Sequence, residues 1–143
     1  MLLFASLFGS FVMLIGVAGF QGRTAVADDC DVARFQGTWR ILSVECSGKP
    51  DNRDNEKYTI TFNDNMMKFR DCEDGDQAAV KFQLHKGQSE KHIRFGSVRG
   101  IYDFKNGNLL ICYSLDGDRP AEFATTSDRP GEVLMILERL EQP

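Results

Sequence analysis

The sequence predicts an all-β protein that folds as an eight-stranded up-and-down antiparallel barrel. From Trp39 onward, apolar side chains recur at every second position, which is the period of a strand rather than that of a helix. Eight such runs follow one another, mostly through short turns rich in Gly, Asn and Asp. Gly37 and Trp39 begin the first run and Arg139 ends the last, so the two outer strands can pair and leave no exposed edge.

The first four expected strands lie between residues 39 and 85. A strand over 39–46 is followed by clean alternation over 58–62, and the turn residues 63–65 lead into a returning strand over 67–72. Residues 80–85 place Val, Phe and Leu on one face and Lys, Gln and His on the other. This alternation predicts a third antiparallel neighbour with one face toward the core.

The last four expected strands lie over 93–95, 101–104, 109–114 and 133–139. Asn106 and Gly107 tolerate positive φ, so the third of these strands should follow the second through a tight hairpin. A longer connection over 116–130 precedes the last and most apolar strand. Little helix is expected beyond one turn around residues 31–35.

Closure of the barrel predicts a contact between its first and last strands. In an up-and-down barrel the first strand begins at the end where the last one finishes, so Trp39 and Arg139 would be neighbours. A guanidinium stacked over an indole contributes about 0.5–2 kcal/mol, and Gly37 gives the backbone room to turn into the strand. The alternative is an ordinary core tryptophan with an exposed arginine at the end of the last strand.

Residues 1–27 are typical of an export leader. They hold an almost unbroken apolar run and no acidic side chain, and they end in Ala25-Val26-Ala27, the small-x-small pattern that precedes cleavage. We therefore expect a signal peptide over 1–27, a single β-barrel domain over 28–143, and a secreted or periplasmic protein. An uncleaved membrane anchor is the alternative, since the run is near the ~20 residues that span a bilayer.

The charge balance argues against nucleic acid as a partner. Removal of the leader takes away Arg23 and no acid, which leaves 16 Lys and Arg against 21 Asp and Glu, a net charge of −5. Basic residues are dispersed through the strands, so no positive stripe that would neutralise a phosphate backbone is expected.

Four cysteines follow the leader, and an even number in an exported chain suggests disulfides. Cys46 and Cys72 are predicted to emerge at the same rim of the barrel and to pair, which leaves Cys30 with Cys112 or both free. Cys112 lies in an apolar strand and is equally explained as a free, buried cysteine. No pair has the close spacing of a zinc or thiol-redox site.

No catalytic or metal site is predicted. The acidic residues over 71–76 lack the ligand spacing of a calcium-binding loop and indicate a solvated turn. His85 and His92 lie at strand ends facing solvent, without a partner in sequence that would fix their tautomers. Ser97 lacks the context of a nucleophile elbow. We expect a protein that is not an enzyme and has no cofactor.

The barrel interior is where a function is expected. An eight-stranded barrel is just wide enough to be filled by its own side chains or to hold one small ligand, and at this point both alternatives are open. The expected interior comprises Tyr58, Ile60, Phe62, Met67, Phe69, Val80, Phe82, Leu84, Phe95, Ile111, Tyr113 and Met135. The candidate ligand-lining residues among them are Tyr58, Phe62, Phe69, Phe82, Phe95 and Tyr113.

An ordered series of motifs resembles a planctomycete-type lipocalin-like domain family and covers nearly the whole chain after the leader. The motifs are Phe35-Gln36-Gly37-Thr38-Trp39, Gly48-Lys49-Pro50, Gly100-Ile101-Tyr102, Leu110-Ile111-Cys112-Tyr113, Arg119-Pro120-x-Glu122-Phe123 and Leu137-Glu138-Arg139. The resemblance implies an extracytoplasmic, lipocalin-like barrel of unassigned role and supplies no catalytic residues. It also implies that the position of Cys112 commonly holds a lone cysteine.

Two functions therefore remain open. The first is binding of a small hydrophobic ligand inside the barrel, which requires a continuous apolar cavity of roughly 300 Å³ or more. The second is a module that binds an extracytoplasmic protein partner, such as an inhibitor of an exported enzyme, with a filled barrel and with residues 116–130 and 48–56 as its contact surface. Membrane association is expected only if the leader is uncleaved.

Overall fold

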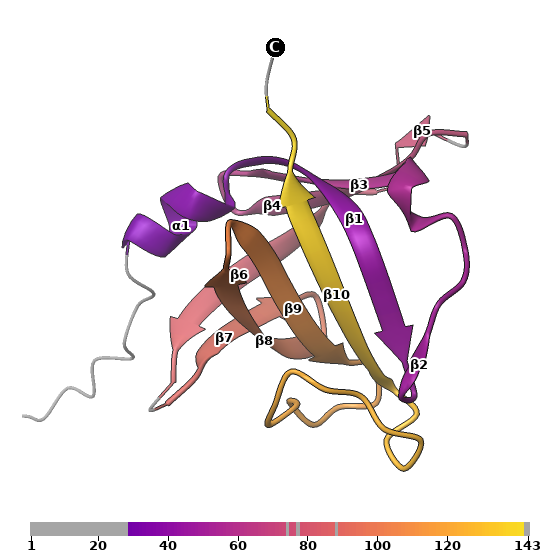
Figure 1. Cartoon of the computed structure of the whole chain (residues 1–143). Helices are drawn as coiled ribbons and strands as arrows, with labels where there is room; N and C mark the ends of the chain where they lie inside the picture. Colours follow the sequence, from indigo (N-terminus) through magenta and orange to yellow (C-terminus); the bar gives the residue numbers. More distant parts are fainter. Residues whose placement is uncertain (1–28, 74, 77, 88, 142–143) are drawn as a thin grey trace, which may run out of the picture.

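Eight antiparallel strands form a closed barrel in the computed structural model (Figure 1), which confirms the predicted fold class. The structure describes residues 29–73, 75–76, 78–87 and 89–141, so the expected leader over 1–27 lies outside the described residues. Within these ranges, no helix has the length and apolar character needed to cross a membrane.

Ten strands, one short α-helix and one 3₁₀ turn make up the described chain. They are α1 (Asp29–Phe35), β1 (Gly37–Cys46), β2 (Lys49–Pro50), η1 (Asn55–Lys57), β3 (Tyr58–Asn63), β4 (Met66–Asp71), β5 (Gly75–Asp76), β6 (Val80–Lys86), β7 (Lys91–Phe95), β8 (Val98–Lys105), β9 (Asn108–Ser114) and β10 (Glu132–Arg139). The eight longer strands correspond to the eight expected ones. The two-residue strands β2 and β5 have no alternation pattern and were not expected.

The eight long strands pair in chain order, and the barrel closes where β1 pairs with β10. The closing ladder runs from Trp39 opposite Arg139 to Cys46 opposite Val133, with an irregularity between Ile41 and Ser43. β1 and β10 lie side by side along their length in Figure 1. Closure leaves neither strand as a free edge, which removes the principal aggregation hazard of an open sheet.

Sequence-encoded turns set the register of the hairpins. Asn106 and Gly107 have φ of 54° and 80°, and they join β8 to β9 in a two-residue connection between Lys105 and Asn108. Positive φ at both central residues produces the turn whose twist matches that of paired strands. The tight hairpin predicted from this Asn-Gly dipeptide is present.

Neighbouring strands of the barrel differ in how much of their length is paired. β4 and β6 pair only through Met66 with Lys81 and Met67 with Val80. β1 pairs with β3 only over residues 37–40 before continuing along β10. The strands are therefore paired all the way round the barrel near α1. Toward the opposite end β4 separates from β6 and β1 from β3, and we call this the splayed end.

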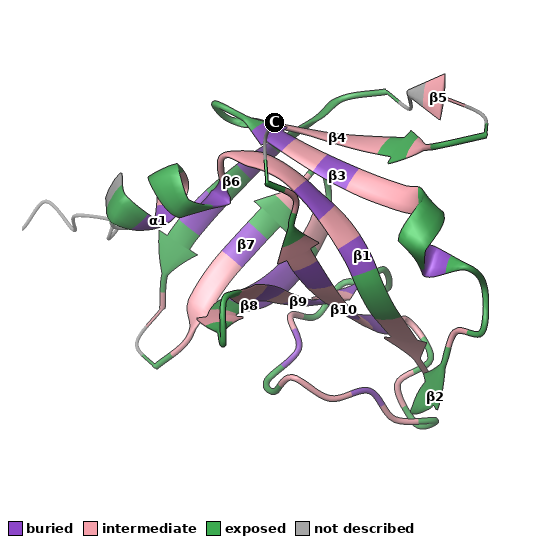
Figure 2. Cartoon of the chain, turned by 45° about the horizontal axis from the view of Figure 1, so that its top comes forward, coloured by how far each residue is buried: buried purple, intermediate pink, exposed green. Residues whose placement is uncertain are grey.

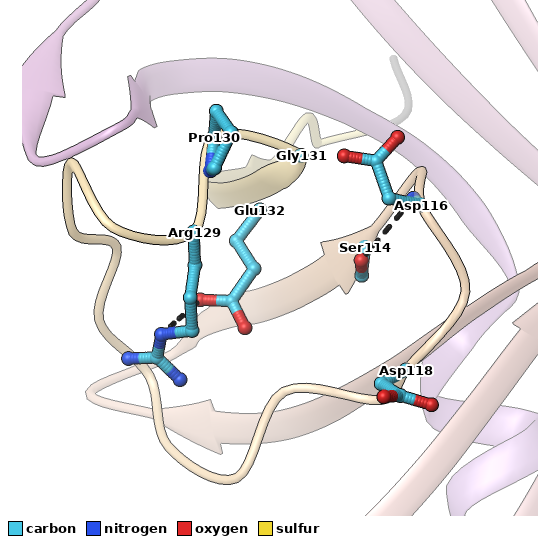
Figure 3. Close-up of a pocket in the computed structure, with 7 residues that line it drawn as sticks. All are labelled: Ser114, Asp116, Asp118, Arg129, Pro130, Gly131 and Glu132. Carbon is cyan, nitrogen blue, oxygen red and sulfur yellow. Dashed lines mark hydrogen bonds and ion pairs between the residues drawn. The ribbon is translucent and has the colours of Figure 1, made fainter.

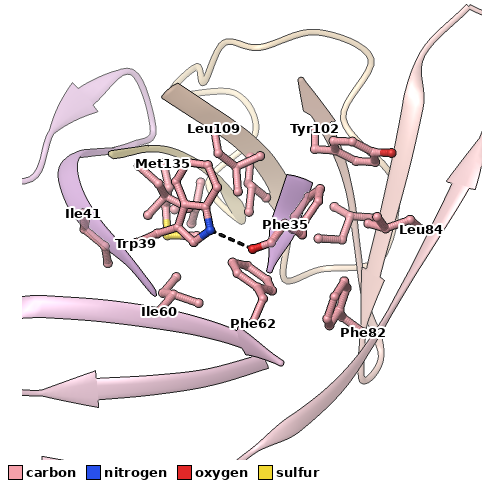
Figure 4. Close-up of a cluster of buried hydrophobic side chains, with 14 residues drawn as sticks. Phe35, Trp39, Ile41, Ile60, Phe62, Phe82, Leu84, Tyr102, Leu109 and Met135 are labelled. Atoms are coloured by element: carbon pink, nitrogen blue, oxygen red, sulfur yellow. Dashed lines mark hydrogen bonds between the residues drawn. The ribbon is translucent and has the colours of Figure 1, made fainter. Parts of the chain in front are cut away.

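The end of the barrel that carries α1 is filled with aromatic rings (Figure 4). Phe35, the last residue of α1, is fully buried, and its ring lies 4.9–5.8 Å from the rings of Phe62, Phe82, Tyr102 and Phe104. Figure 2 shows buried residues on α1 and along the strands that surround it. Phe35 therefore acts as a plug inserted between the strands.

Six of the twelve residues of the expected interior are buried, five are partly buried, and one is exposed. Val80 is 37% exposed because it begins β6 where that strand diverges from β4. Large buried residues that were not in the expected interior are Phe35, Ile41, Ile93, Tyr102, Leu109, Val133 and Leu137.

The predicted disulfide between Cys46 and Cys72 is wrong in this structure, in which all four cysteines are free. The physical reason is the length of β1. The Cys72 amide donates to Lys57 O, beside the start of β3, whereas β1 continues past its last pairing with β3 at Arg40. Cys46 consequently lies about four residues, roughly 13 Å, further along the strand direction. Cys112 is fully buried, in agreement with the free-cysteine alternative.

Candidate functional site

The closure residues meet at the end of the barrel next to α1. The Arg139 guanidinium lies 4.3 Å from the Trp39 ring centroid. Arg139 Nη1 donates to Gln36 O at 2.5 Å, and Nη2 donates to Arg34 O. Gly37 has a φ of 113°, and a Cβ at this position would lie 3.0 Å from Arg139 Nη1. Positive φ and the closeness of the guanidinium together explain why glycine stands here.

An ion pair between a buried carboxylate and a partly exposed lysine anchors α1 to the wall. Asp31 is 5% exposed, and its Oδ2 lies 2.9 Å from Lys91 Nζ and accepts a hydrogen bond of 3.0 Å from the Tyr102 hydroxyl. Burial acts to raise the pKa of Asp31, but hydrogen bonds from Lys91 and Tyr102 and the charge of Arg34 outweigh it and lower the pKa below its usual range. The carboxylate is thus charged at neutral pH, and it holds the plug in place.

A cavity of about 240 Å³ lies at the opposite end of the barrel. Its walls are built from inward-facing side chains of β1, β3, β4, β9 and β10, namely Ile41, Val44, Tyr58, Phe69, Tyr113 and Met135. The uneven pairing of the strands produces this space, and no described residue fills the splayed end as Phe35 fills the other. The interior is therefore filled by side chains at the end next to α1 and contains a cavity at the splayed end.

Three of the six candidate ligand-lining residues line this cavity. Tyr58 and Phe69 stack with ring centroids 5.3 Å apart, and Tyr113 lies on the facing wall. Phe62 and Phe82 instead pack around the Phe35 plug, so their assignment to the ligand lining is wrong. The sixth candidate, Phe95, contacts the Tyr113 ring edge-on at 5.2 Å and is not part of the cavity lining.

The segment over residues 51–57 forms the rim of the cavity. It is held to β1 by a 2.8 Å hydrogen bond from Asp51 N to Val44 O, and the buried Asn55 donates to Asp51 O at 3.2 Å. Arg53 and Asn55 complete the cavity lining. No alternation marks this segment in the sequence. Its run of Asp, Asn and Arg predicts only a polar loop, so its position across the mouth could not be foreseen.

The cavity is apolar with polar groups placed at its edge. Burial raises the pKa of Tyr113 to about 12, so its hydroxyl is protonated at neutral pH, and it makes no hydrogen bond with any described residue. The Arg53 side chain is held by both carboxylate oxygens of Asp51, at 2.5–3.1 Å. The Tyr113 hydroxyl and the fixed guanidinium of Arg53 are thus two hydrogen-bond donors that a guest could use.

A second hollow of about 290 Å³ lies under the connection between β9 and β10 (Figure 3). Ser114, Asp116, Asp118 and Glu132 surround it, which suggests a cation, but the arrangement does not support one. Glu132 is paired with Arg129 Nε at 3.3 Å, and Figure 3 shows the carboxylates of Asp116 and Asp118 directed away from Glu132. Among the described residues, no three His, Cys, Asp or Glu side chains form a group suited to a metal ion.

The two segments predicted as a protein-contact surface pack against each other. The buried Thr125 donates to Glu45 Oε1 at 2.6 Å and accepts a hydrogen bond of 2.9 Å from Gly48 N. This contact ties the connection over 115–131 to the β1–β2 turn. The polar groups of Thr125 are therefore used within the fold and are not available to a partner.

The two histidines lie opposite each other on β6 and β7. His85 pairs with His92, and His92 Nε2 lies 3.6 Å from Glu90 Oε2. Neither histidine lines the cavity described above, and Ser97 lies in the turn between β7 and β8. The expectation that the protein is not an enzyme stays a prediction.

No family model, no curated protein and no solved structure matches the chain. The resemblance to a planctomycete-type lipocalin-like family therefore stays a prediction. The assignment of the fold as an up-and-down eight-stranded barrel rests on the observed strand pairing.

Proposed function

We propose that the protein binds a small, mostly apolar ligand in the cavity at the splayed end of its barrel. The observation that carries this proposal is the cavity of about 240 Å³, whose wall is built from interior residues of five strands while the other end is plugged. A pocket with apolar walls and a few convergent polar groups is the usual form of a small-molecule site.

The cavity volume limits the size of the guest. Sites for drug-sized molecules span about 300–1,000 Å³. The observed space of about 240 Å³ is smaller than the roughly 300 Å³ required at the outset from the sequence, so we restrict the proposal to a guest the size of a single ring system or a short acyl chain. Each 100 Å² of apolar ligand surface removed from water contributes about 2.5 kcal/mol. The stacked rings of Tyr58 and Phe69 favour a flat guest that can pack against them.

Polar groups at the rim would orient the guest. Tyr113 offers a hydroxyl whose proton has no acceptor among the described residues, and Arg53 presents its guanidinium beside the mouth. A ligand with an apolar body and an anionic or carbonyl head satisfies both donors. Because the sequence predicts an export leader over 1–27, we propose that this binding takes place outside the cytoplasm.

The experiment is a fluorescence titration of the purified protein with naphthalene-1-sulfonate, which has one flat aromatic ring system and an anionic head. We expect saturable binding with one site and micromolar affinity. In the variant Val44→Phe the added ring fills the cavity, so we expect affinity to fall at least tenfold.

The matched control is Leu115→Phe, which adds an aromatic ring at a position that is 63% exposed and outside the cavity. It should bind the probe as the wild type does. Circular dichroism of both variants checks that the barrel is intact. Equal affinity of the wild type and a folded Val44→Phe variant, or the absence of saturable binding to the wild type, would refute the proposal.

A further inference from the structure

The outer face of the barrel over β6, β7 and β8 gathers positive charge that is scattered in the sequence. Arg94 on β7 pairs directly with Arg99 on β8, and Lys81 lies next along the outer face of β6, with its carbonyl bonded to Gly96 N. Arg119, from the connection after β9, lies close enough to Arg99 to feel its charge. We call this set the cationic face: Lys81, Arg94, Arg99 and Arg119.

No carboxylate that the structure describes forms an ion pair with a residue of the cationic face. Arg94 Nε donates to Gly96 O and Arg119 Nε donates to Gly100 O, both backbone carbonyls. Burial and the charge of Arg99 lower the pKa of Arg119, and the charge of Glu90 opposes this more weakly. The face therefore has no ion pair with a described residue, and Glu90 acts on Arg119 only from beyond ion-pair distance.

Most arginines elsewhere in the described chain differ from those of the cationic face, although Arg139 also donates to backbone carbonyls. In the described chain, four arginines outside this face lie within ion-pair distance of carboxylates, namely Arg34, Arg40, Arg53 and Arg129. The contrast is marked in a chain with more acidic than basic residues. Like charges directly opposite each other on paired strands destabilise a sheet, so the Arg94–Arg99 pair lowers stability unless an anion lies between them.

A depression of about 280 Å³ accompanies the charge. It is lined by Lys81, Gln83, Arg94 and Gly96. The absence of a side chain at Gly96 and the outward direction of Lys81, Gln83 and Arg94 leave donors around a concave space. Guanidinium groups present a planar fork that matches the oxygens of phosphate and sulfate.

We infer that the cationic face is a binding site for a phosphate or sulfate group, centred on Arg94 and Arg99. The group is either the free ion or an ester on a small molecule whose remaining part occupies the depression beside Lys81 and Gln83. The site is on the outside of the wall, so it is independent of the ligand cavity. The anion site can therefore exist even if the cavity binds no ligand, and the reverse also holds.

The test is a titration of the ¹⁵N-labelled protein followed by amide chemical shifts. Inorganic phosphate, inorganic sulfate and glucose 6-phosphate are added separately, with sodium chloride at matched ionic strength as reference because exposed charges are screened by salt. We expect saturable shifts at Arg94, Gly96 and Arg99 with millimolar affinity. Tighter binding of glucose 6-phosphate than of inorganic phosphate identifies an ester as the ligand, and equal affinity identifies the free ion.

The variant is the double substitution Arg94→Gln and Arg99→Gln, with Lys105→Gln as the matched control at the exposed end of β8. We expect the double variant to lose at least tenfold in affinity and the control to match the wild type. Without anions, the thermal midpoint of the double variant should equal or exceed that of the wild type, because repulsion is removed. A purely structural role for these arginines predicts a lower midpoint.

Two outcomes would overturn the inference. One is the absence of saturable shifts with all three probes at 50 mM, a concentration well above the expected dissociation constant. The other is binding that the double variant retains. Binding only to a polyanion such as heparin would likewise exclude a small-ligand site and assign the face to general electrostatic attraction.

Discussion

Arg139 joins three parts of the protein through one side chain. Its guanidinium covers the indole of Trp39 and donates to the last carbonyls of the α1 region, at Arg34 and Gln36. A cation over an aromatic face contributes about 0.5–2 kcal/mol, and a hydrogen bond about 0.5–1.5 kcal/mol net. The strand that closes the barrel therefore also caps the helix that plugs it.

Replacement of Arg139 by alanine should destabilise the protein by about 1–3 kcal/mol, because the stacking and both hydrogen bonds are lost together. Lysine keeps the charge but not the planar fork, so Arg139→Lys should recover less than half of this. Urea unfolding followed by the fluorescence of the single tryptophan measures both. Lys105→Ala is the control, with an expected effect within 0.5 kcal/mol. An Arg139→Ala midpoint equal to that of the wild type would show that the contact contributes nothing.

Asp31 should make stability depend on pH at the acidic end. Its pKa is lowered in the folded state, so its contribution is fully present above the unfolded value of about 3.9 and is lost as pH falls through the folded value. We expect Asp31→Asn to cost about 1–3 kcal/mol at pH 7. Below pH 4 the difference from the wild type should shrink.

Urea unfolding at pH 7, 5, 4 and 3 measures this difference. The exposed Asp128→Asn variant is the control, which should follow the wild type at each pH. A constant gap between Asp31→Asn and the wild type across this range would mean that the carboxylate charge is not what anchors α1.

The connection over residues 115–131 and the β1–β2 turn behave as one structural unit. Thr125 links them by accepting from Gly48 N and donating to Glu45 Oε1, and Leu115 N donates to Gly131 O across the base of the connection. A long connection held in this way is ordered by its own hydrogen bonds rather than by burial of a large apolar surface. Its stability should thus depend on very few groups.

Thr125→Val keeps the shape of the side chain but leaves Gly48 N and Glu45 without their partner. We expect a loss of about 1–3 kcal/mol, and faster amide exchange within 115–131 than in β9 and β10. Hydrogen exchange measures the local effect. Ser127→Ala, an exposed position on the same connection, should change neither quantity. Uniform acceleration over the entire barrel would indicate that the link supports global folding and not this unit.

The barrel could be predicted from the sequence because strand alternation and turn chemistry are local signals. Its plug could not, since a seven-residue helix has too few turns to show a period, and Phe35 is buried only because the barrel closes around it. Phe62 and Phe82 were correctly placed inside but wrongly assigned to a ligand, because alternation gives the face of a strand and not the depth along the barrel.

Long-range neighbours account for the remaining differences. Arg94 and Arg99 are charges on separate strands, and only the pairing of β7 with β8 puts them opposite each other. The sequence therefore suggested dispersed basic residues where the structure has a cationic face. The pairing of Cys46 with Cys72 was predicted wrongly for a related reason. β1 stays paired with β10 up to Cys46 but loses its pairing with β3 after Arg40, so the two cysteines are far apart along the strand direction.

The two ends of the described chain emerge beside the plug. α1 precedes β1 there, and Leu140 N donates to Thr38 O just after β10 ends (Figure 1). A purification handle or a fusion partner joined after β10 would consequently leave the barrel at the end filled by Phe35. Coupled to a sensor chip through such a handle, the molecule would present its cavity to the flowing solution, unobstructed by the attachment.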